Sequence, residues 1–177
     1  VSGSVNELDA LLSQQAYRLA YWKLGYEEIN YRRFFDVNEL VGIRIESPEV
    51  FDNRNRQTLE LVRRGRVTGL RIDHIDGLWD PECYLRRMNS QAGETYIVVE
   101  KILGRDEPLP AEWPVSGTTG YDFLNAVNGV FIDPDGLARL EEVYQRRTGN
   151  YLPFAERCYQ CNKLAMNTMF HGDMASL

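Results

Sequence analysis

Several features that would restrict the function of this chain are missing from its sequence. No run of roughly 18 apolar residues occurs, so we expect no membrane-spanning helix, and the first residues lack the basic and apolar regions of a signal peptide. Three cysteines are too few for a disulfide framework, which favours a reducing compartment. Acidic residues outnumber basic ones by 26 to 20, so a nucleic-acid-binding surface is not expected. These absences predict a cytoplasmic protein with neither nucleic-acid nor membrane partners.

What the sequence does contain is the composition of an ordinary globular domain. Its 177 residues are 44% hydrophobic and 26% charged, and this length is ample for a buried core. The first residue is Val1 rather than a methionine, and we therefore expect the chain to be a piece of a longer protein.

Helices and strands alternate in the centre of the sequence. Helices are predicted over residues 47–65 and 80–93, because each begins with a capping residue followed by proline and ends at a glycine. Strands are predicted over residues 67–73 and 96–99. Short connections and near-continuous apolar strands favour an α/β fold with parallel β/α repeats, right-handed crossovers and both faces of the sheet buried.

The flanking segments have a different character. Leucines at helical spacing predict a helix over 5–15, whereas 17–38 is dense in aromatic residues and arginine and is expected to form loops and short elements. Residues 103–119 contain three prolines and lead into a Gly-Thr-Thr-Gly turn at 117–120, after which the pattern is helical. We therefore predict three parts: a loop or insert domain over 1–46, a β/α segment over 47–120, and a helical subdomain over 121–177.

Two acidic residues stand at the ends of the two predicted strands. Because side chains alternate along a strand, Arg71 and Asp73 share one face of the first strand, and the guanidinium would keep the carboxylate ionised. Glu100 directly follows the second strand, whose four apolar residues suit a proton donor at its tip. Active sites of parallel β/α folds lie at the C-terminal ends of strands, where Asp73 and Glu100 are both expected.

The expected spacing of these two carboxyl groups indicates glycoside chemistry. Neighbouring strands run roughly 4.8 Å apart. The side chains of Asp73 and Glu100 could therefore approach to about 5–5.5 Å, which is the separation found in retaining glycosidases. In such a pair one carboxylate is the nucleophile, and the other donates a proton and then acts as a base.

Other interpretations of the same residues remain open. Arg71 and Asp73 could form a simple salt bridge at a sheet end, and Glu100 could be a helix cap or a solvent contact. Residues 73–76 (Asp-His-Ile-Asp) also hold three side chains that can ligate a metal, as in metal-dependent hydrolases. The other histidine, His171, is far away in the sequence, and we therefore expect neither a metal nor a cofactor.

Several motifs resemble those of known enzymes. Residues 69–73 (GLRID) are similar to the fourth-strand motif G-x-R-x-D of the alpha-amylase superfamily, and residues 96–100 are similar to its fifth-strand motif. Residues 36–38 (DVN) resemble the superfamily's short motif in the loop domain after strand three. The resemblance to one family, the maltooligosyl trehalose synthases, covers nearly the whole chain and is carried by longer runs at 17–22, 28–36, 71–81 and 113–125.

The resemblance implies an activity and a role for each candidate residue. Members of this family convert the reducing-end α-1,4 linkage of a malto-oligosaccharide into an α,α-1,1 linkage, which is a step of trehalose biosynthesis and needs no cofactor. Asp73 would attack the anomeric carbon, and Glu100 would be the general acid and base. Loop 113–121 would close over the site and exclude water. Substrate-binding roles would fall to Arg71, which also holds Asp73, and to His74, Asp76, Lys101 and Tyr121.

The chain also departs from the superfamily pattern. It lacks the third-strand and seventh-strand motifs, the latter of which supplies a third catalytic carboxylate, and an eight-stranded barrel needs about 250 residues. We therefore expect part of a (β/α)8 barrel, the region of strands four and five, with a loop domain before it and a helical insertion after it. Such a fragment should be inactive alone and should be prone to self-association through its exposed sheet edges. The alternatives are another superfamily hydrolase or glucanotransferase, or a non-catalytic carbohydrate-binding piece.

Overall fold

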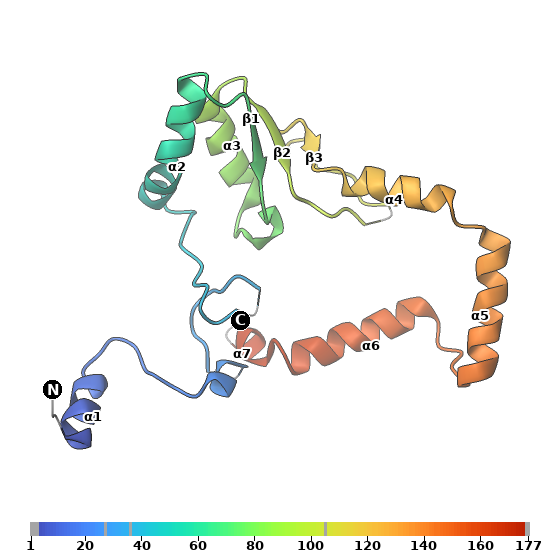
Figure 1. The fold of residues 1–177 in the computed structure, drawn as a ribbon, viewed down its shortest axis with the longest axis horizontal. Coiled ribbons are helices and arrows are strands. Elements are labelled where there is room, and N and C mark those ends of the chain that lie inside the picture. Colours follow the sequence, from blue (N-terminus) through green and yellow to red (C-terminus); the bar gives the residue numbers. More distant parts are fainter. Residues whose placement is uncertain (1–3, 27, 36, 105, 176–177) are drawn as a thin grey trace. The chain divides into compact units, whose positions relative to one another are not determined.

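The computed structural model describes residues 4–26, 28–35, 37–104 and 106–175, and Figure 1 shows its ribbon. The chain forms two compact units. One is Ile43–Asn150, and the other combines Val1–Gly42 with Tyr151–Leu177. All the residues predicted to form the active site belong to the first unit. The three-part division at residues 46 and 120 stays a prediction.

A parallel sheet lies at the centre of the unit Ile43–Asn150. Its described strands are β1 (Gly69–Ile72), β2 (Tyr96–Val99) and β3 (Gly117–Thr118), in the order β1-β2-β3. β1 and β2 pair in register along their whole length, from Gly69 opposite Tyr96 to Ile72 opposite Val99. The two predicted strands and their parallel pairing are confirmed, although β1 is shorter than the predicted run at 67–73.

Two helices cover the sheet and begin where the sequence predicts. α2 (Pro48–Arg63) starts after Ser47, whose backbone is extended, and α3 (Pro81–Ala92) starts after Asp80. The Asp80 carboxylate accepts a hydrogen bond of 2.9 Å from the Cys83 backbone N–H, one of the donors that a helix start leaves unpaired. Gly93 ends α3 at a φ of 65°, a conformation that glycine adopts without strain.

The hydrophobic core lies on one face of the sheet, between the sheet and these two helices. α2 contributes Phe51 and Leu59 to it, and α3 contributes Leu85 and Met88. Burying each large apolar side chain contributes about 1.5–3 kcal/mol. The prediction that both faces are buried is wrong, because α2 and α3 pack together on the same face; the side chain of Tyr96, on the other face, is 60% exposed.

The segment 117–120 is a second point at which the structure differs from the sequence-based expectation. Instead of a simple turn, Gly117 and Thr118 form β3, which pairs in parallel with Val98 and Val99 of β2. The Thr119 N–H also donates to the Val99 carbonyl at 3.0 Å. A strand of two residues that begins with glycine has no alternating apolar pattern, and the sequence therefore gave no signal for it.

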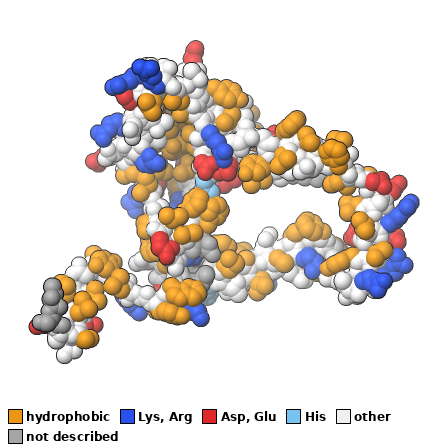
Figure 2. All heavy atoms as spheres, in the orientation of Figure 1, with side chains coloured by type: hydrophobic (Ala, Val, Ile, Leu, Met, Phe, Trp, Pro, Cys, Tyr) orange, Lys and Arg blue, Asp and Glu red, His pale blue; other side chains and the backbone are white. Residues whose placement is uncertain are grey.

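The chain after residue 120 is helical, as predicted. Within the unit Ile43–Asn150 the structure describes two further α-helices, α4 (Tyr121–Val130) and α5 (Pro134–Thr148). The Asp133 carboxylate caps the start of α5. Hydrophobic side chains are exposed along both helices (Figure 2), including Phe123, Val130, Leu137, Leu140 and Val143.

The second unit contains helices and irregular segments. Its described elements are α1 (Val5–Ser13), the 3-10 helix η1 (Trp22–Tyr26), α6 (Phe154–Asn167) and α7 (His171–Ala175). A single antiparallel bridge joins Arg33 to Val41. Of the predicted loop motif at 36–38, Asp36 lies outside the described residues. Among the helices that the structure describes, none combines the length and the apolar character needed to cross a membrane.

Candidate active site

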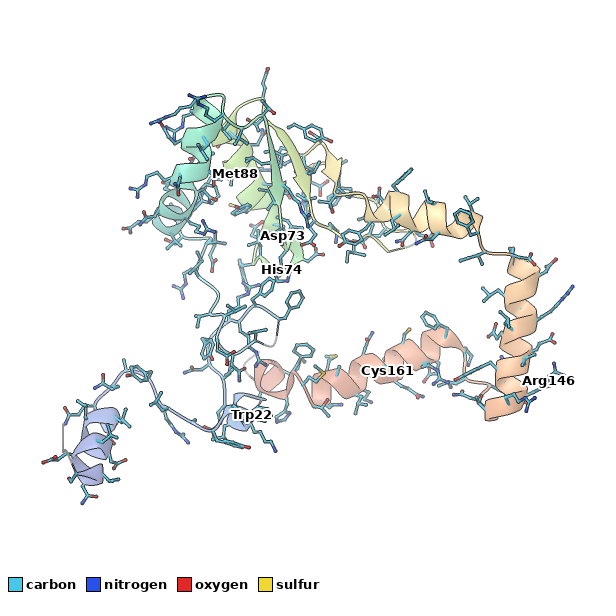
Figure 3. The ribbon with its side chains drawn as sticks, viewed as in Figure 1. Trp22, Asp73, His74, Met88, Arg146 and Cys161 are labelled. Atoms are coloured by element: carbon cyan, nitrogen blue, oxygen red, sulfur yellow. The ribbon has the colours of Figure 1, made fainter. Side chains whose placement is uncertain are left out.

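Asp73 and Glu100 lie side by side at the C-terminal ends of β1 and β2. Asp73 follows Ile72, the last residue of β1, and Glu100 follows Val99, which pairs with Ile72. The Glu100 N–H donates to the Ile72 carbonyl at 2.8 Å, which extends the strand pairing to the acidic residue itself. Figure 3 shows Asp73 and His74 just beyond the end of β1. The two carboxylates therefore stand at the ends of paired neighbouring strands, as predicted.

The guanidinium of Arg71 bridges the two carboxylates. Its Nη2 atom lies 2.8 Å from Asp73 Oδ1 and 3.3 Å from Glu100 Oε1. Because both oxygens contact one nitrogen, Asp73 Oδ1 and Glu100 Oε1 are separated by no more than the sum of these distances, roughly 6 Å. This limit is compatible with the ~5–5.5 Å separation of the carboxyl groups in retaining glycosidases. The ion pair with Asp73 was predicted, whereas the sequence did not reveal that Arg71 also reaches Glu100.

The two carboxyl groups have different environments. The side chain of Asp73 is 65% exposed, whereas that of Glu100 is 25% exposed. Glu100 is also held at both oxygens, because Oε1 contacts Arg71 and Oε2 accepts a hydrogen bond of 2.8 Å from the His74 backbone N–H. Glu100 is therefore fixed from two directions, and Asp73 is the more accessible of the two.

His74 adopts an unusual backbone conformation in the segment that follows β1. Its φ and ψ of 51° and 44° are left-handed, a region that residues other than glycine rarely adopt. The 3-10 helix η2 (Ile75–Gly77) follows, anchored by the fully buried Ile75. The imidazole lies where a Cβ at Gly77 would stand, so glycine leaves the space for it. His74 was predicted to contact sugar hydroxyls, whereas the hydrogen bond from its backbone N–H to Glu100 was not predicted.

Lys101 and Asp76, both predicted to bind substrate, are paired with each other. Lys101 Nζ lies 3.1 Å from Asp76 Oδ1 and 3.0 Å from Glu107 Oε1. The hydrogen bond to Glu107 is the main reason why the pKa of Lys101 is raised above its ordinary value. The pKa of Glu107 is lowered, first by the hydrogen bond from the Gly104 N–H and then by Lys101. Glu107 was not predicted, because no periodic pattern relates it to Lys101 within an irregular segment.

Tyr121 is the first residue of α4 and is partly buried. In the described part of the chain it makes no hydrogen bond with Asp73 or Glu100, and its predicted contact with substrate stays a prediction. Trp113, at the start of the predicted closing loop, packs against the core cluster that contains Ile75 and Val99. Trp113 therefore contributes to the core in this chain.

The metal interpretation and a surface depression are the alternatives to this site. Among the described residues, no three His, Cys, Asp or Glu side chains are arranged as a metal-ligating group, so the alternative metal interpretation of residues 73–76 gains no support.

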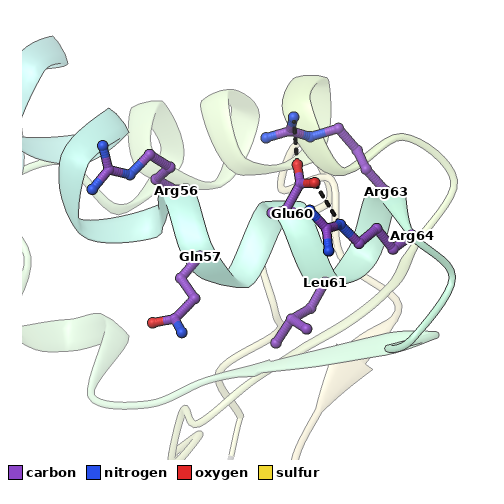
Figure 4. Close-up of a pocket in the computed structure, with 6 residues that line it drawn as sticks. All are labelled: Arg56, Gln57, Glu60, Leu61, Arg63 and Arg64. Atoms are coloured by element: carbon purple, nitrogen blue, oxygen red, sulfur yellow. Dashed lines mark hydrogen bonds and ion pairs between the residues drawn. The ribbon is translucent and has the colours of Figure 1, made fainter.

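A depression of about 780 Å³ lies on α2 (Figure 4). There Glu60 pairs with Arg63 at 3.0 Å and with Arg64 at 2.6 Å, and the hydrogen bond from Arg64 lowers the pKa of Glu60. This depression contains none of the predicted site residues.

Known proteins resemble both the sequence and the fold of the chain. No protein-family model matches it. The maltooligosyltrehalose synthase of Arthrobacter ramosus superposes with a TM-score of 0.91 at 36% identity, over 99% of this chain and 23% of the synthase. A Sulfolobus tokodaii protein described as a hypothetical maltooligosyl trehalose synthase superposes with a TM-score of 0.81 at 39% identity, over 96% of this chain and 22% of that protein.

A curated sequence gives the same result. A Mycobacterium tuberculosis protein provisionally named maltooligosyl trehalose synthase is 41% identical over 143 residues, which are 80% of this chain. The chain is homologous to a segment of maltooligosyl trehalose synthase. It spans 18% of the length of the Mycobacterium relative and 22–23% of the two solved synthases named above. The predicted resemblance is thereby confirmed, and the α/β architecture with parallel strands corresponds to part of the synthase fold.

Proposed function

We propose that this chain supplies the nucleophile and the general acid/base of a maltooligosyl trehalose synthase. The observation that carries the proposal is the bridging of Asp73 and Glu100 by a single nitrogen of Arg71, which brings one oxygen of each carboxylate, at the ends of neighbouring parallel strands, within roughly 6 Å of the other. The homology to synthases supports the same substrate class, a malto-oligosaccharide. In this proposal β1 and β2 are strands four and five of a (β/α)8 barrel.

In the first step Asp73 attacks the anomeric carbon of the sugar next to the reducing-end glucose. A bond forms between the carboxylate oxygen and this carbon while the α-1,4 bond breaks, and Glu100 gives its proton to the departing oxygen. The products are a glycosyl ester on Asp73, a free 4-hydroxyl on the glucose, and an ionised Glu100. The exposure of Asp73 suits the nucleophile, because this carboxylate must reach the sugar.

In the second step the released glucose returns through a different hydroxyl. Glu100 takes the proton from the 1-hydroxyl of the glucose, whose oxygen then forms a bond to the anomeric carbon as the ester bond to Asp73 breaks. Two inversions retain the configuration and give an α,α-1,1 linkage. Water must be excluded between the steps, because it would compete with the bound glucose for the ester.

Arg71 positions both acids in this scheme. Its guanidinium contacts both carboxylates and holds them side by side, while the His74 N–H fixes the second oxygen of Glu100. His74, Asp76 and Tyr121 remain candidates for contacts with sugar hydroxyls.

The proposal is tested in the full-length protein that contains this chain, with Asp73→Asn and Glu100→Gln as the variants. Removing an acid/base group lowers the rate of trehalose-end formation by about 10²–10⁴-fold, and losing the nucleophile lowers it at least as far. Asp135→Asn and Glu94→Gln are matched controls at exposed positions on α5 and before β2, and both should retain full activity. Undiminished activity in Asp73→Asn would contradict the proposal.

Analysis of the products distinguishes the alternative activities. A synthase removes reducing ends without shortening the chain, whereas a hydrolase releases free glucose or maltose. A non-catalytic carbohydrate-binding segment would bind glucan equally well with Asp73 or Asn at this position, and Asp73→Asn would leave turnover intact.

A further inference from the structure

The side chain of Lys101 joins the segment that follows Asp73 to the segment that follows Glu100. Its ammonium group lies between Asp76 in η2 and Glu107 in the irregular segment before β3, at 3.1 and 3.0 Å. The Lys101 side chain is only 13% exposed, although both carboxylates that it contacts are about half exposed. An ammonium group removed from water in this way is costly unless it is paired, and here it is paired twice.

The position of this ion-pair cluster in the chain gives it a structural consequence for the site. Asp76 lies three residues after Asp73, and Lys101 directly follows Glu100. The ammonium group therefore ties the turn after the proposed nucleophile to the residue after the proposed acid. The backbone at Lys101 is also held close to the end of β2, because the Lys101 N–H donates to the Val99 carbonyl at 3.0 Å.

Glu107 is itself held in place from a second direction. Its Oε2 atom accepts a hydrogen bond of 2.9 Å from the Gly104 backbone N–H, while Oε1 contacts Lys101. The glutamate thereby closes the turn at 104–107 onto the ammonium group. Two carboxylates at one ammonium group, one of them fixed by a backbone donor, form a cluster whose charges hold the side chains in one arrangement.

We propose that Lys101 is a positioning residue that, through Asp76 and Glu107, fixes the spacing of Asp73 and Glu100. This inference builds on the proposed function, because the spacing matters only if the two carboxylates react with one sugar. It assigns a role to Glu107 and replaces the direct contact with substrate expected for Lys101. A displacement of about 1 Å in a reacting group can cost about a hundredfold in rate.

The test compares Lys101→Met, Glu107→Gln and the double variant in the full-length protein that contains this chain. Each single variant should lower kcat by roughly ten- to a hundredfold with little change in KM, and the double variant should be no worse than the poorer single variant. Lys101→Arg should restore part of kcat. Lys163→Met on α6 and Glu112→Gln, both at exposed positions, are matched controls that should keep wild-type kcat.

A direct contact between Lys101 and the sugar gives a different result. Lys101→Met would then raise KM, Glu107→Gln would have no effect, and the two changes would be independent. Any of these three results would overturn the positioning role. Full kcat in Lys101→Met would overturn it as well, irrespective of KM.

A second measurement does not depend on activity. Hydrogen exchange of the Gly104 amide and of residues 74–77 should become faster in Lys101→Met, whereas the α2 amides should be unchanged. Unchanged exchange at both places would contradict the proposal even if the variant were unstable or poorly active. If Asp73→Asn retains activity, the proposed function itself fails. If Asp73→Asn is inactive while Lys101→Met and Glu107→Gln are both fully active, the proposed function stands and the positioning role fails.

Discussion

The backbone N–H of His74 donates a hydrogen bond of 2.8 Å to Glu100 Oε2 and so links the end of β1 to the end of β2. The bond forms because His74 adopts a left-handed backbone conformation directly after Asp73. A single residue thus turns the chain away from β1 and aims a donor at the carboxyl group of the neighbouring strand. Backbone strain of this kind costs about 1–3 kcal/mol and persists only where surrounding contacts hold it.

Replacing Gly77 by alanine should disturb this link. The new Cβ would collide with the His74 imidazole, so the ring has to move. We expect the displaced ring to disturb the turn at 74–77. We expect kcat of the full-length protein to fall by about tenfold or more, because a small displacement of a reacting group is costly. Steady-state kinetics provide the measurement.

Gly129→Ala is the matched control for that substitution. Gly129 lies inside α4, where a Cβ would meet no atom within 4 Å. Alanine there should leave kcat unchanged and stabilise the helix by about 0.5–1 kcal/mol. If Gly77→Ala behaved like this control, the proposed restriction on His74 would be wrong.

The core beneath the site should be sensitive to lost volume. Leu85 is fully buried against Ile75, two residues after Asp73, and Val99, directly before Glu100. Leu85→Ala should destabilise this region by about 2–5 kcal/mol. Hydrogen exchange at the amides of β2 would report the loss as faster opening. Leu61→Ala is the comparison, because Leu61 is exposed on α2; equal effects of the two changes would contradict the core described here.

The ion pairs of Lys101 should be stable only within a window of pH. The pKa of Glu107 is lowered in the folded chain. The contribution of Glu107 to stability is therefore fully present at a pH above the ordinary pKa of a glutamate. It is lost as the pH falls through the lower pKa of the folded state and the carboxylate is protonated. The pKa of Lys101 is raised in the folded chain. The contribution of Lys101 to stability is therefore fully present at a pH below the ordinary pKa of a lysine, and it is lost as the pH rises through the raised pKa and the ammonium group is deprotonated.

This window is measured by the exchange protection of the Gly104 amide, after correction for the intrinsic dependence of exchange on pH. Protection should be level near neutral pH and fall in acid below pH 4.5, the ordinary pKa of a glutamate side chain. In Glu107→Gln the fall in acid should disappear. A fall of the same size in that variant would show that another group is responsible.

Much of this site could be predicted from the sequence, because local signals agreed with one another. The caps and glycines around residues 47–93 define two helices, and alternation in 69–73 places Arg71 and Asp73 on one face. The parallel pairing then brings Glu100 beside Asp73. These features depend on neighbouring residues and on the period of a strand, which a sequence displays directly.

The remaining features depend on tertiary contacts that have no local signature. The contact of Arg71 with Glu100 joins residues 29 positions apart, and Glu107 reaches Lys101 from an irregular segment. The two-residue strand β3 is defined by its pairing with β2 and not by a sequence pattern of its own. The expectation of a sheet buried on both faces failed because it was drawn from apolar content, while the structure placed both helices on one side.

The covalent intermediate offers the most direct test of the central claim. The full-length protein that contains this chain would be incubated with a 5-fluoro-glucosyl fluoride, whose ester forms readily and breaks down slowly, and then digested and examined by mass spectrometry. The account predicts one fluoroglucosyl group on the peptide that contains Asp73, attached to that aspartate. A label on another residue, or complete turnover with no label at all, would contradict it.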